Sequence, residues 1–232
     1  MKQIPNVLTC LNLFSGCIAC VMALNGQYEW ALLWVVIAAV FDFADGFVAR
    51  LLKAYSAIGK ELDSLADVVS FGVAPGMVVF YYLNAMEKMP TVILPFLAFM
   101  IPAFSALRLA KFNLDERQTG SFLGLPVPAN ALFWCSFIPS LAYFNIGNEV
   151  FQVAIILGLA VICCLLMVSE IPMFSLKFKH YKWKGNEAQY ILIVLSIISL
   201  CLFKYAGIFI IIVVYVLISM VLNIIRKNQS TA

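Results

Sequence analysis

Long apolar stretches separated by short polar connections follow one another along the whole chain. Eight of them approach the roughly 20 apolar residues that a helix needs to cross a bilayer. They cover residues 7–24, 30–50, 60–83, 91–110, 129–145, 150–168, 189–203 and 206–225. A chain inside a bilayer must satisfy its backbone polar groups internally, and helices do so. We therefore predict an all-α integral membrane protein, a bundle of about eight transmembrane helices in a single membrane domain over residues 1–232.

The composition excludes a soluble globule. Of the 232 residues, 64% are hydrophobic and 12% are charged, which leaves too little polar surface to cover a water-soluble protein. The first apolar stretch lacks a small-residue cleavage site, so we interpret it as a retained span rather than a signal peptide. Cys17 and Cys20 form a CxxC pair in the middle of this span, with no second pair, which favours apolar packing over metal or redox chemistry.

Basic residues gather in alternate connections. One side of the predicted bundle receives Lys2, Arg50, Lys53, Lys60, Arg108, Lys111, Arg117, Lys177, Lys179, Lys182, Lys184, Arg226 and Lys227. The other side receives only Lys88 and Lys204. Because Lys and Arg concentrate in cytoplasmic loops, this asymmetry predicts that both termini lie on the cytoplasmic side of the cell inner membrane.

Four carboxylates interrupt the apolar pattern near the end of the second span and the start of the third. Asp42 and Asp45 are three residues apart, and Asp63 and Asp67 are four apart, so each pair lies on one face of its own helix. Four acids that converge on one point repel one another strongly unless a cation lies among them. Mg²⁺ and Mn²⁺ bind carboxylate oxygens and commonly bind substrate phosphates as well. The pattern therefore predicts a metal–diphosphate site at the cytoplasmic edge.

Small residues accompany the acids at helical spacing. Gly46 and Ala49 follow the repeat of the first pair, and Gly59 precedes the second pair by four residues. They remove bulk where a ligand or a neighbouring backbone comes close. In an alternative interpretation, the acids only pair with the basic connection between the two helices, which contains Arg50, Lys53 and Lys60. That alternative explains the charge balance but not the spacing of the glycines and alanine.

Further polar residues suggest a cavity and an anion site. Asn6, Thr9 and Asn12 recur every third residue in the first span, a stripe that either bonds to a neighbouring helix or lines a wet cavity. Asn130, after the stiff turn at 124–128, is a further candidate for that cavity. At the end of the fourth span, basic residues either anchor the topology or bind an anion such as a lipid phosphate or a carboxylate; these are Arg108 and Lys111.

The second half of the chain carries less chemistry. Residues 169–188 alternate aromatic and basic side chains, which predicts a segment along the inner leaflet with its lysines on anionic lipid. Nucleic-acid binding uses the same residue types, but we do not expect it beside two membrane spans. The last two spans, within 189–225, are predicted to be scaffold or dimer surface.

The spacing Asp42-x2-Asp45-Gly46-x2-Ala49-Arg50-x8-Gly59-x3-Asp63-x3-Asp67 resembles the signature of the CDP-alcohol phosphotransferases. All eight positions of that signature are present. Within the family, residues 4–16, 60–76, 108–113 and 124–130 are most similar to the membrane-integral phosphatidylserine synthases. Lys111 departs from the arginine expected in many relatives, and it keeps the charge but loses the bidentate fork.

The resemblance implies a helical membrane enzyme, usually a homodimer, whose catalytic helices lie within 4–130. Such an enzyme moves a phosphatidyl group from CDP-diacylglycerol to an alcohol, here L-serine, among membrane lipids, and it releases CMP. By analogy, Asp42, Asp45 and Asp63 coordinate Mg²⁺ or Mn²⁺. Asp67 completes a site for two ions and acts as the general base on the incoming hydroxyl.

The same resemblance assigns binding roles to other residues. The nucleotide and diphosphate are assigned to Asn6, Thr9, Gly46, Ala49, Arg50, Ser56 and Gly59. Gly59 is also expected to let the two motif helices close on each other. The acceptor or a lipid phosphate is assigned to Lys53, Arg108, Lys111 and Asn113.

Three alternatives remain open. The signature does not separate serine transfer from the synthesis of phosphatidylglycerol phosphate, an inositol phospholipid or archaetidylserine. A cation transporter also places acids within spans, but here they gather at one edge rather than along a route across the bilayer. A non-catalytic membrane scaffold gives no reason for the arrangement of the signature residues.

Overall fold

The computed structural model describes residues 3–54, 56–87, 91–114, 122–143, 147–174 and 186–230. Its helices are α1 (Ile4–Leu24), α2 (Tyr28–Leu51), α3 (Ala57–Asp67), the π-helical η1 (Val68–Val73), α4 (Ala74–Asn84), the 3₁₀-helical η2 (Leu94–Phe99), α5 (Met100–Leu114), α6 (Val127–Tyr143), α7 (Glu149–Val168), α8 (Glu187–Phe203) and α9 (Ala206–Ser230). Two short antiparallel strands, β1 (Phe122–Leu123) and β2 (Pro172–Met173), pair Phe122 with Met173. The prediction of an all-α membrane protein is confirmed.

Each predicted span coincides with a helical segment. Among the described residues, six segments are long and apolar enough to cross a membrane: 4–24, 28–51, 57–84, 94–114, 149–168 and 206–225. The remaining two, Val127–Leu141 and Glu187–Phe203, are apolar but shorter. The third span is continuous from α3 through η1 to α4, and its π-helical part begins directly after Asp67. Such π-helical segments are frequent at functional sites.

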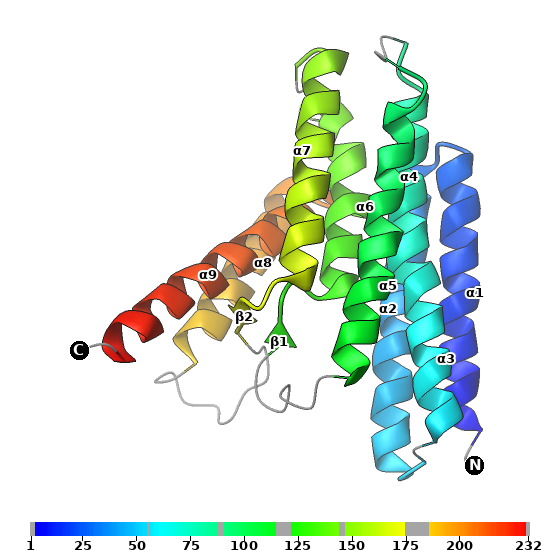
Figure 1. The fold of residues 1–232 in the computed structure, drawn as a ribbon, viewed down its shortest axis with the longest axis vertical. Helices are drawn as coiled ribbons and strands as arrows, with labels where there is room; N and C mark the ends of the chain where they lie inside the picture. Colours follow the sequence, from blue (N-terminus) through cyan, green and yellow to red (C-terminus); the bar gives the residue numbers. More distant parts are fainter. Residues whose placement is uncertain are drawn as a thin grey trace.

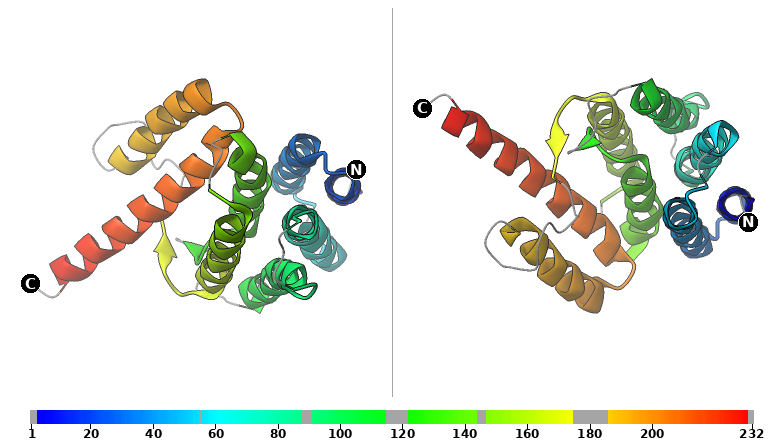
Figure 2. Two further views of the ribbon diagram at one scale, coloured as in Figure 1. Left: turned by 90° about the horizontal axis from the view of Figure 1, so that it is seen from above. Right: turned by 90° about the horizontal axis from the view of Figure 1, so that it is seen from below.

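Successive spans run in opposite directions, and α1 to α7 form an upright bundle (Figure 1). The α8–α9 hairpin leans away from that bundle when it is seen from above or below (Figure 2). α6 lies at the centre, where it packs against α2, α4 and α9. Its aromatic residues make the core there, with Phe133 and Phe137 stacked at 5.4 Å and Phe209 of α9 edge-on to both.

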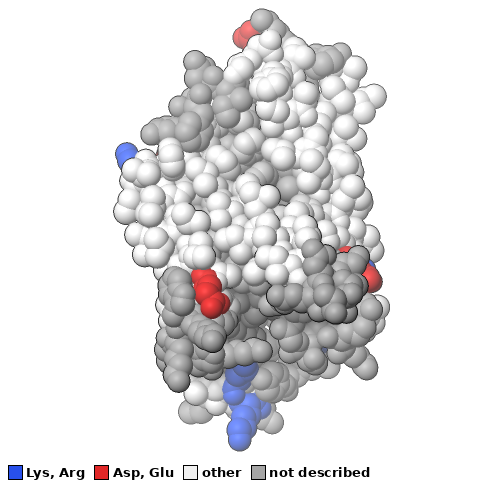
Figure 3. Space-filling model, turned by 90° about the vertical axis from the view of Figure 1, so that its left-hand side faces the viewer, with Lys and Arg blue, Asp and Glu red and all other residues white. Residues whose placement is uncertain are grey.

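Charge is distributed unevenly along the bundle. In Figure 3, charged side chains gather mainly in the lower half of the face shown, and the upper half is almost entirely uncharged. The N-terminus lies at the lower end of the molecule in Figure 1, as does the α2–α3 turn, which contains Lys53. The predicted inner-leaflet segment 169–188 is described only for 169–174 and 186–188, and residues 175–185 lie outside the described part of the chain. Orientation in the membrane therefore stays a prediction.

α1 approaches the third span very closely. A Cβ added to Gly16 would lie 2.7 Å from the Cα of Ser70 in η1, which is too close for any side chain. The Ser70 hydroxyl donates a hydrogen bond of 3.0 Å to the carbonyl of Asn12 on α1. Gly16 therefore sets the distance between α1 and the helix that carries Asp67.

We predict that Gly16→Ala destabilises the protein by about 1–3 kcal/mol, because the added methyl group overpacks this contact. The control is Gly158→Ala on α7, where an added Cβ has nothing within 4 Å. Thermal unfolding in detergent should show a lower Tm for Gly16→Ala. The Gly158→Ala variant should melt at or above the wild-type temperature, because alanine favours the helix. Equal Tm values for the two variants would contradict the close approach of α1 to η1.

Candidate active site

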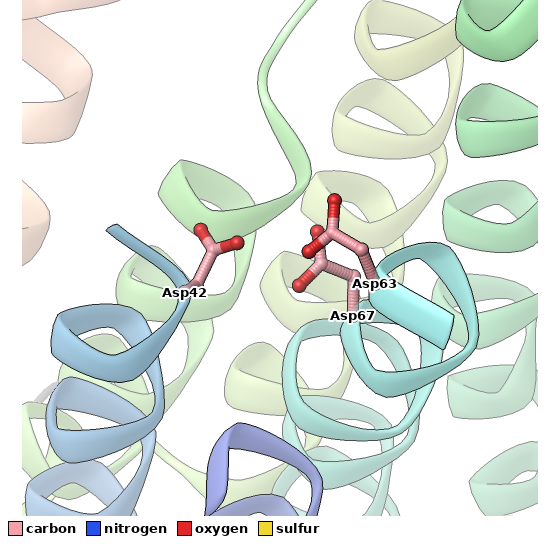
Figure 4. Close-up of side chains that lie close together, drawn as sticks. All are labelled: Asp42, Asp63 and Asp67. Atoms are coloured by element: carbon pink, nitrogen blue, oxygen red, sulfur yellow. The ribbon is translucent and has the colours of Figure 1, made fainter. Parts of the chain in front are cut away.

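Three carboxylates converge between α2 and α3. Oxygen atoms of Asp42, Asp63 and Asp67 all lie within 4.8 Å of one another. Figure 4 shows Asp42 projecting from α2 toward Asp63 and Asp67, which project from α3. Asp67 is buried, and the other two are half-buried. The helical spacing of four places Asp63 and Asp67 one above the other, so two helices suffice to assemble the cluster.

The fourth predicted acid, Asp45, is not part of this group. It is buried one turn from Asp42, and its Oδ2 accepts a hydrogen bond of 2.6 Å from the Thr9 hydroxyl of α1. Asp45 nevertheless interacts electrostatically with Asp42 and Asp63, so all four acids lie in one region. A role for Asp45 as a metal ligand stays a prediction. Sequence spacing predicts a shared helical face, but it does not say which neighbour takes each side chain.

α1 lies against both helices that carry the cluster. It packs on α2 and on α3, whereas α2 and α3 have little direct packing on each other. Asn12 of α1 is fully buried, and its Nδ2 donates a hydrogen bond of 3.1 Å to Asp67 Oδ1. The first span therefore positions one acid from each pair, through Thr9 and Asn12.

The cluster has the properties of a divalent-cation site. Within the described part of the chain, no salt bridge joins its carboxylates to a lysine or arginine. Arg50 instead donates from Nε to the Gly46 carbonyl at 3.0 Å, and Lys60 donates to the Asn113 carbonyl at 3.2 Å. Oδ1 of Asp63 is buried without a hydrogen-bond partner. The alternative in which the acids only pair with the basic connection therefore does not match the structure, and these oxygens suit Mg²⁺ or Mn²⁺.

A cavity of about 880 Å³ adjoins the cluster. It is lined by Pro5, Asn6, Thr9, Asp45, Gly46, Ala49, Arg50, Ala54, Ser56, Ala57, Gly59, Lys60, Asp63 and Phe112. All seven residues that the resemblance assigns to the nucleotide and diphosphate are among them. Asp63 belongs to both the cavity and the carboxylate cluster. The volume of the cavity falls in the range of small-molecule and cofactor sites.

Two glycines at the cavity differ in surroundings. A Cβ on Gly46 would have nothing within 4 Å, so the space beside it is open to a ligand. A Cβ on Gly59 would lie 2.9 Å from Ser56 Oγ and 3.1 Å from Asn6 Oδ1. Ser56 also caps α3, because its hydroxyl accepts from the Gly59 N–H at 2.9 Å. The expected role of Gly59 in closing the two motif helices is therefore corrected, since its close approach is to α1.

Of the residues assigned to the acceptor, Arg108 and Lys111 line one small pocket, and Lys53 and Asn113 do not line it. Lys53 is exposed, and Lys111 donates to the Val168 carbonyl at 3.3 Å and pairs with Glu170 at 3.8 Å. Asn113 donates from Nδ2 to the Ser64 hydroxyl at 2.8 Å.

Of the four, Arg108 is the one whose charge acts on the carboxylate cluster. It is buried in α5, its Nε has no partner, and its guanidinium interacts electrostatically with Asp67. Its guanidinium also lies 5.3 Å from the centre of the Phe112 ring.

The sequence analysis missed a residue on α9, in a span expected to be scaffold. Tyr215 is buried, and its hydroxyl donates to the Phe174 carbonyl at 3.2 Å, just after β2. Tyr215 also interacts electrostatically with Arg108. The signal available in the sequence was a tyrosine inside an otherwise aliphatic run, residues 210–218. α9 therefore reaches the surroundings of the cluster through this residue.

Comparison with known proteins agrees with this geometry. A family model described as CDP-alcohol phosphatidyltransferase matches residues 2–166. A CDP-diacylglycerol–serine O-phosphatidyltransferase of Helicobacter pylori strain J99 is 34% identical over 235 residues, which cover 97% of this chain and 96% of the relative. A protein of the same name from Bacillus subtilis strain 168 is 36% identical over 81% of this chain and 96% of its own length. An archaetidylserine synthase of Methanothermobacter thermautotrophicus is 31% identical over 66% of this chain and 64% of the relative.

We predict that Asp42→Ala and Asp63→Ala each weaken Mn²⁺ binding at least roughly tenfold, because each removes a direct carboxylate ligand and even indirect partners of a metal contribute that much. The measurement is a titration of the purified protein with Mn²⁺, in which electron paramagnetic resonance counts the free ion. Glu61→Gln, which removes an exposed carboxylate from the same helix, is the control. Equal weakening in Glu61→Gln, or unchanged affinity in both aspartate variants, would refute a metal site at the cluster.

Proposed function

Because the chain belongs to the CDP-alcohol phosphatidyltransferase family, we propose that this enzyme transfers the phosphatidyl group of CDP-diacylglycerol to the hydroxyl of L-serine. The products are phosphatidylserine and CMP. The relatives named CDP-diacylglycerol–serine O-phosphatidyltransferase, similar along almost the whole chain, support serine as the acceptor.

The observation that carries the proposal is the joining of the carboxylate cluster to the large cavity through Asp63. A nucleotide diphosphate needs room for the nucleotide beside a place where the phosphate charge is neutralised. The cavity has that room, and the cluster offers oxygens for two ions of Mg²⁺ or Mn²⁺, held by Asp42, Asp63 and Asp67 with Asp45 beside them. Bound there, these ions would neutralise charge on the diphosphate oxygens.

The transfer also needs a base. The serine hydroxyl oxygen forms a bond to the phosphorus that carries the diacylglycerol, and the bond from that phosphorus to the oxygen of CMP breaks. The hydroxyl proton goes to a carboxylate, and Asp67 is our candidate because it is buried and is held by Asn12. Arg108, whose charge already acts on Asp67, is our candidate for the serine carboxylate.

The remaining proposals concern location and assembly. The basic lower end of the bundle and the positive-inside rule support a cytoplasmic active site at the inner membrane, with both termini on that side. Acyl chains of the donor and of other membrane lipids contact the apolar outer face, and the nucleotide and serine arrive from water. We also propose that the enzyme forms a homodimer.

A second candidate is archaetidylserine synthesis, favoured by the similarity to the archaeal relative. It uses the same acceptor and the same leaving group, so the site residues would have the same roles. The two functions differ in the donor lipid, which is ether-linked in archaeal lipids. An assay with ester-linked and ether-linked CDP-activated donors therefore separates them.

We predict that purified protein with CDP-diacylglycerol, Mn²⁺ or Mg²⁺ and labelled serine yields labelled phosphatidylserine and an equal amount of CMP. Parallel reactions contain inositol or glycerol 3-phosphate as the acceptor. Chelation with EDTA should abolish product formation, and added metal should restore it. Consumption of inositol or glycerol 3-phosphate in place of serine would overturn the choice of acceptor but not the family.

We predict that Asp67→Asn lowers kcat roughly 10²- to 10⁴-fold, the range expected when a general base is lost. Binding of CDP-diacylglycerol, measured by equilibrium dialysis with labelled donor, should stay close to wild type. Glu61→Gln again serves as the control and should keep full activity. A parallel loss of donor binding and turnover in Asp67→Asn would argue against its role as the base.

A further inference from the structure

Asn12 carries an unused hydrogen-bond acceptor next to Asp67. Its side chain is fully buried on α1, and its Nδ2 donates to Asp67 Oδ1 at 3.1 Å. Its Oδ1 is buried and has no hydrogen-bond partner. Buried polar atoms in native proteins are nearly always bonded, so an unpaired oxygen here calls for an explanation. With divalent cations bound, the carboxylates of the cluster are ionised and only accept hydrogen bonds, so the cluster does not supply one.

The local structure keeps this amide in place. The Asn12 carbonyl accepts from Ser70, and the helix is pressed against η1 at Gly16. Rotating the amide by half a turn would place Oδ1 against the Asp67 carboxylate, where two acceptors repel. The present orientation is therefore the one that Asp67 favours, and it leaves Oδ1 free beside it. A group that pairs with Oδ1 must be a donor, either a buried water or a donor on a ligand that reaches Asp67.

We propose that Asn12 Oδ1 accepts a hydrogen bond from the ammonium group of the acceptor, which makes Asn12 a residue that selects a 2-amino alcohol. This inference rests on the proposed function. In serine the ammonium is on the carbon next to the one that bears the hydroxyl, so a hydroxyl at Asp67 brings the ammonium close to the neighbouring amide. An ammonium has three N–H donors and no acceptor, which matches an oxygen without a partner.

The proposal places the two charged ends of serine on different elements. Arg108 of α5 is our candidate for the carboxylate, and Asn12 of α1 takes the ammonium. Asp67 accepts a hydrogen bond from Asn12 and interacts electrostatically with Arg108. Glycerol 3-phosphate and inositol carry no ammonium, so they would lose this charge-assisted bond. Asn12 then has two roles, since one amide atom positions the proposed base and the other binds the substrate.

The test measures binding of labelled L-serine to the full-length protein loaded with Mn²⁺ and CMP, together with steady-state kinetics. Asn12→Ala should raise the Kd and KM for serine roughly 10- to 100-fold, the effect of losing a hydrogen bond to a charged group. The KM for CDP-diacylglycerol should stay unchanged. Ser15→Ala is the matched control, because it removes a buried hydroxyl of α1 that bonds only to the Leu11 carbonyl of its own helix. It should leave serine affinity at the wild-type value.

Two further measurements separate substrate binding from mere positioning. Asn12→Asp keeps an acceptor oxygen, so it should retain serine affinity, while its negative charge repels Asp67 and lowers kcat. A serine analogue without the amino group should bind wild type and Asn12→Ala equally weakly. Unchanged serine affinity in Asn12→Ala, even with a lower kcat, would overturn the proposal and leave Asn12 as a positioning residue. A wild-type protein that binds no serine and consumes another acceptor would instead refute the proposed function.

Discussion

Mutual repulsion of carboxylates is the constraint on which this site depends. Three aspartates from two helices hold their oxygens within 4.8 Å of one another in a protein with very few charged residues. Within the described chain, no salt bridge neutralises them. Buried like charges are tolerated only where protonation or a bound cation compensates for them. The cluster therefore makes physical sense as one half of a site whose other half is a divalent cation and the phosphates it binds.

The helix that holds this arrangement together carries no acid itself. α1 lies against both α2 and α3 and bonds to an aspartate on each, through Thr9 and Asn12. Its close contact with η1 at Gly16 fixes the position of Asp67 relative to α1. The π-helical segment that follows Asp67 adds a residue to the turn and lets Ser70 reach back to α1. The geometry of the carboxylate cluster is thus set largely by neutral polar residues of a neighbouring span.

The position of the site also suits a substrate with two unlike ends. A cavity of about 880 Å³ receives polar side chains from α1, α2 and α3, while the outer faces of the same helices are apolar. On the proposed function, the nucleotide occupies this cavity and the acyl chains stay on the apolar outer faces. The C-terminal hairpin also approaches this region, because Tyr215 of α9 bonds to the Phe174 carbonyl beside β2 and interacts electrostatically with Arg108. On the proposed function, residues from both halves of the chain therefore surround the acceptor.

Much of the fold follows from local pattern. Residue type and helical period determine the eight apolar segments, their helical state and the helix face that each acidic pair shares. These features do not depend on which helices pack nearby. The residues assigned to the nucleotide also share one cavity, which α1 lines together with the two helices of the signature and the turn between them. The sequence did not determine which helices pack against one another. Only the packing of α1 against α2 and α3 decides that Asp45 bonds to Thr9, that Gly59 faces Asn6, and that Asn12 holds Asp67. Spacing along a chain determines the face of a helix, whereas the partner of that face depends on contacts between residues far apart in sequence.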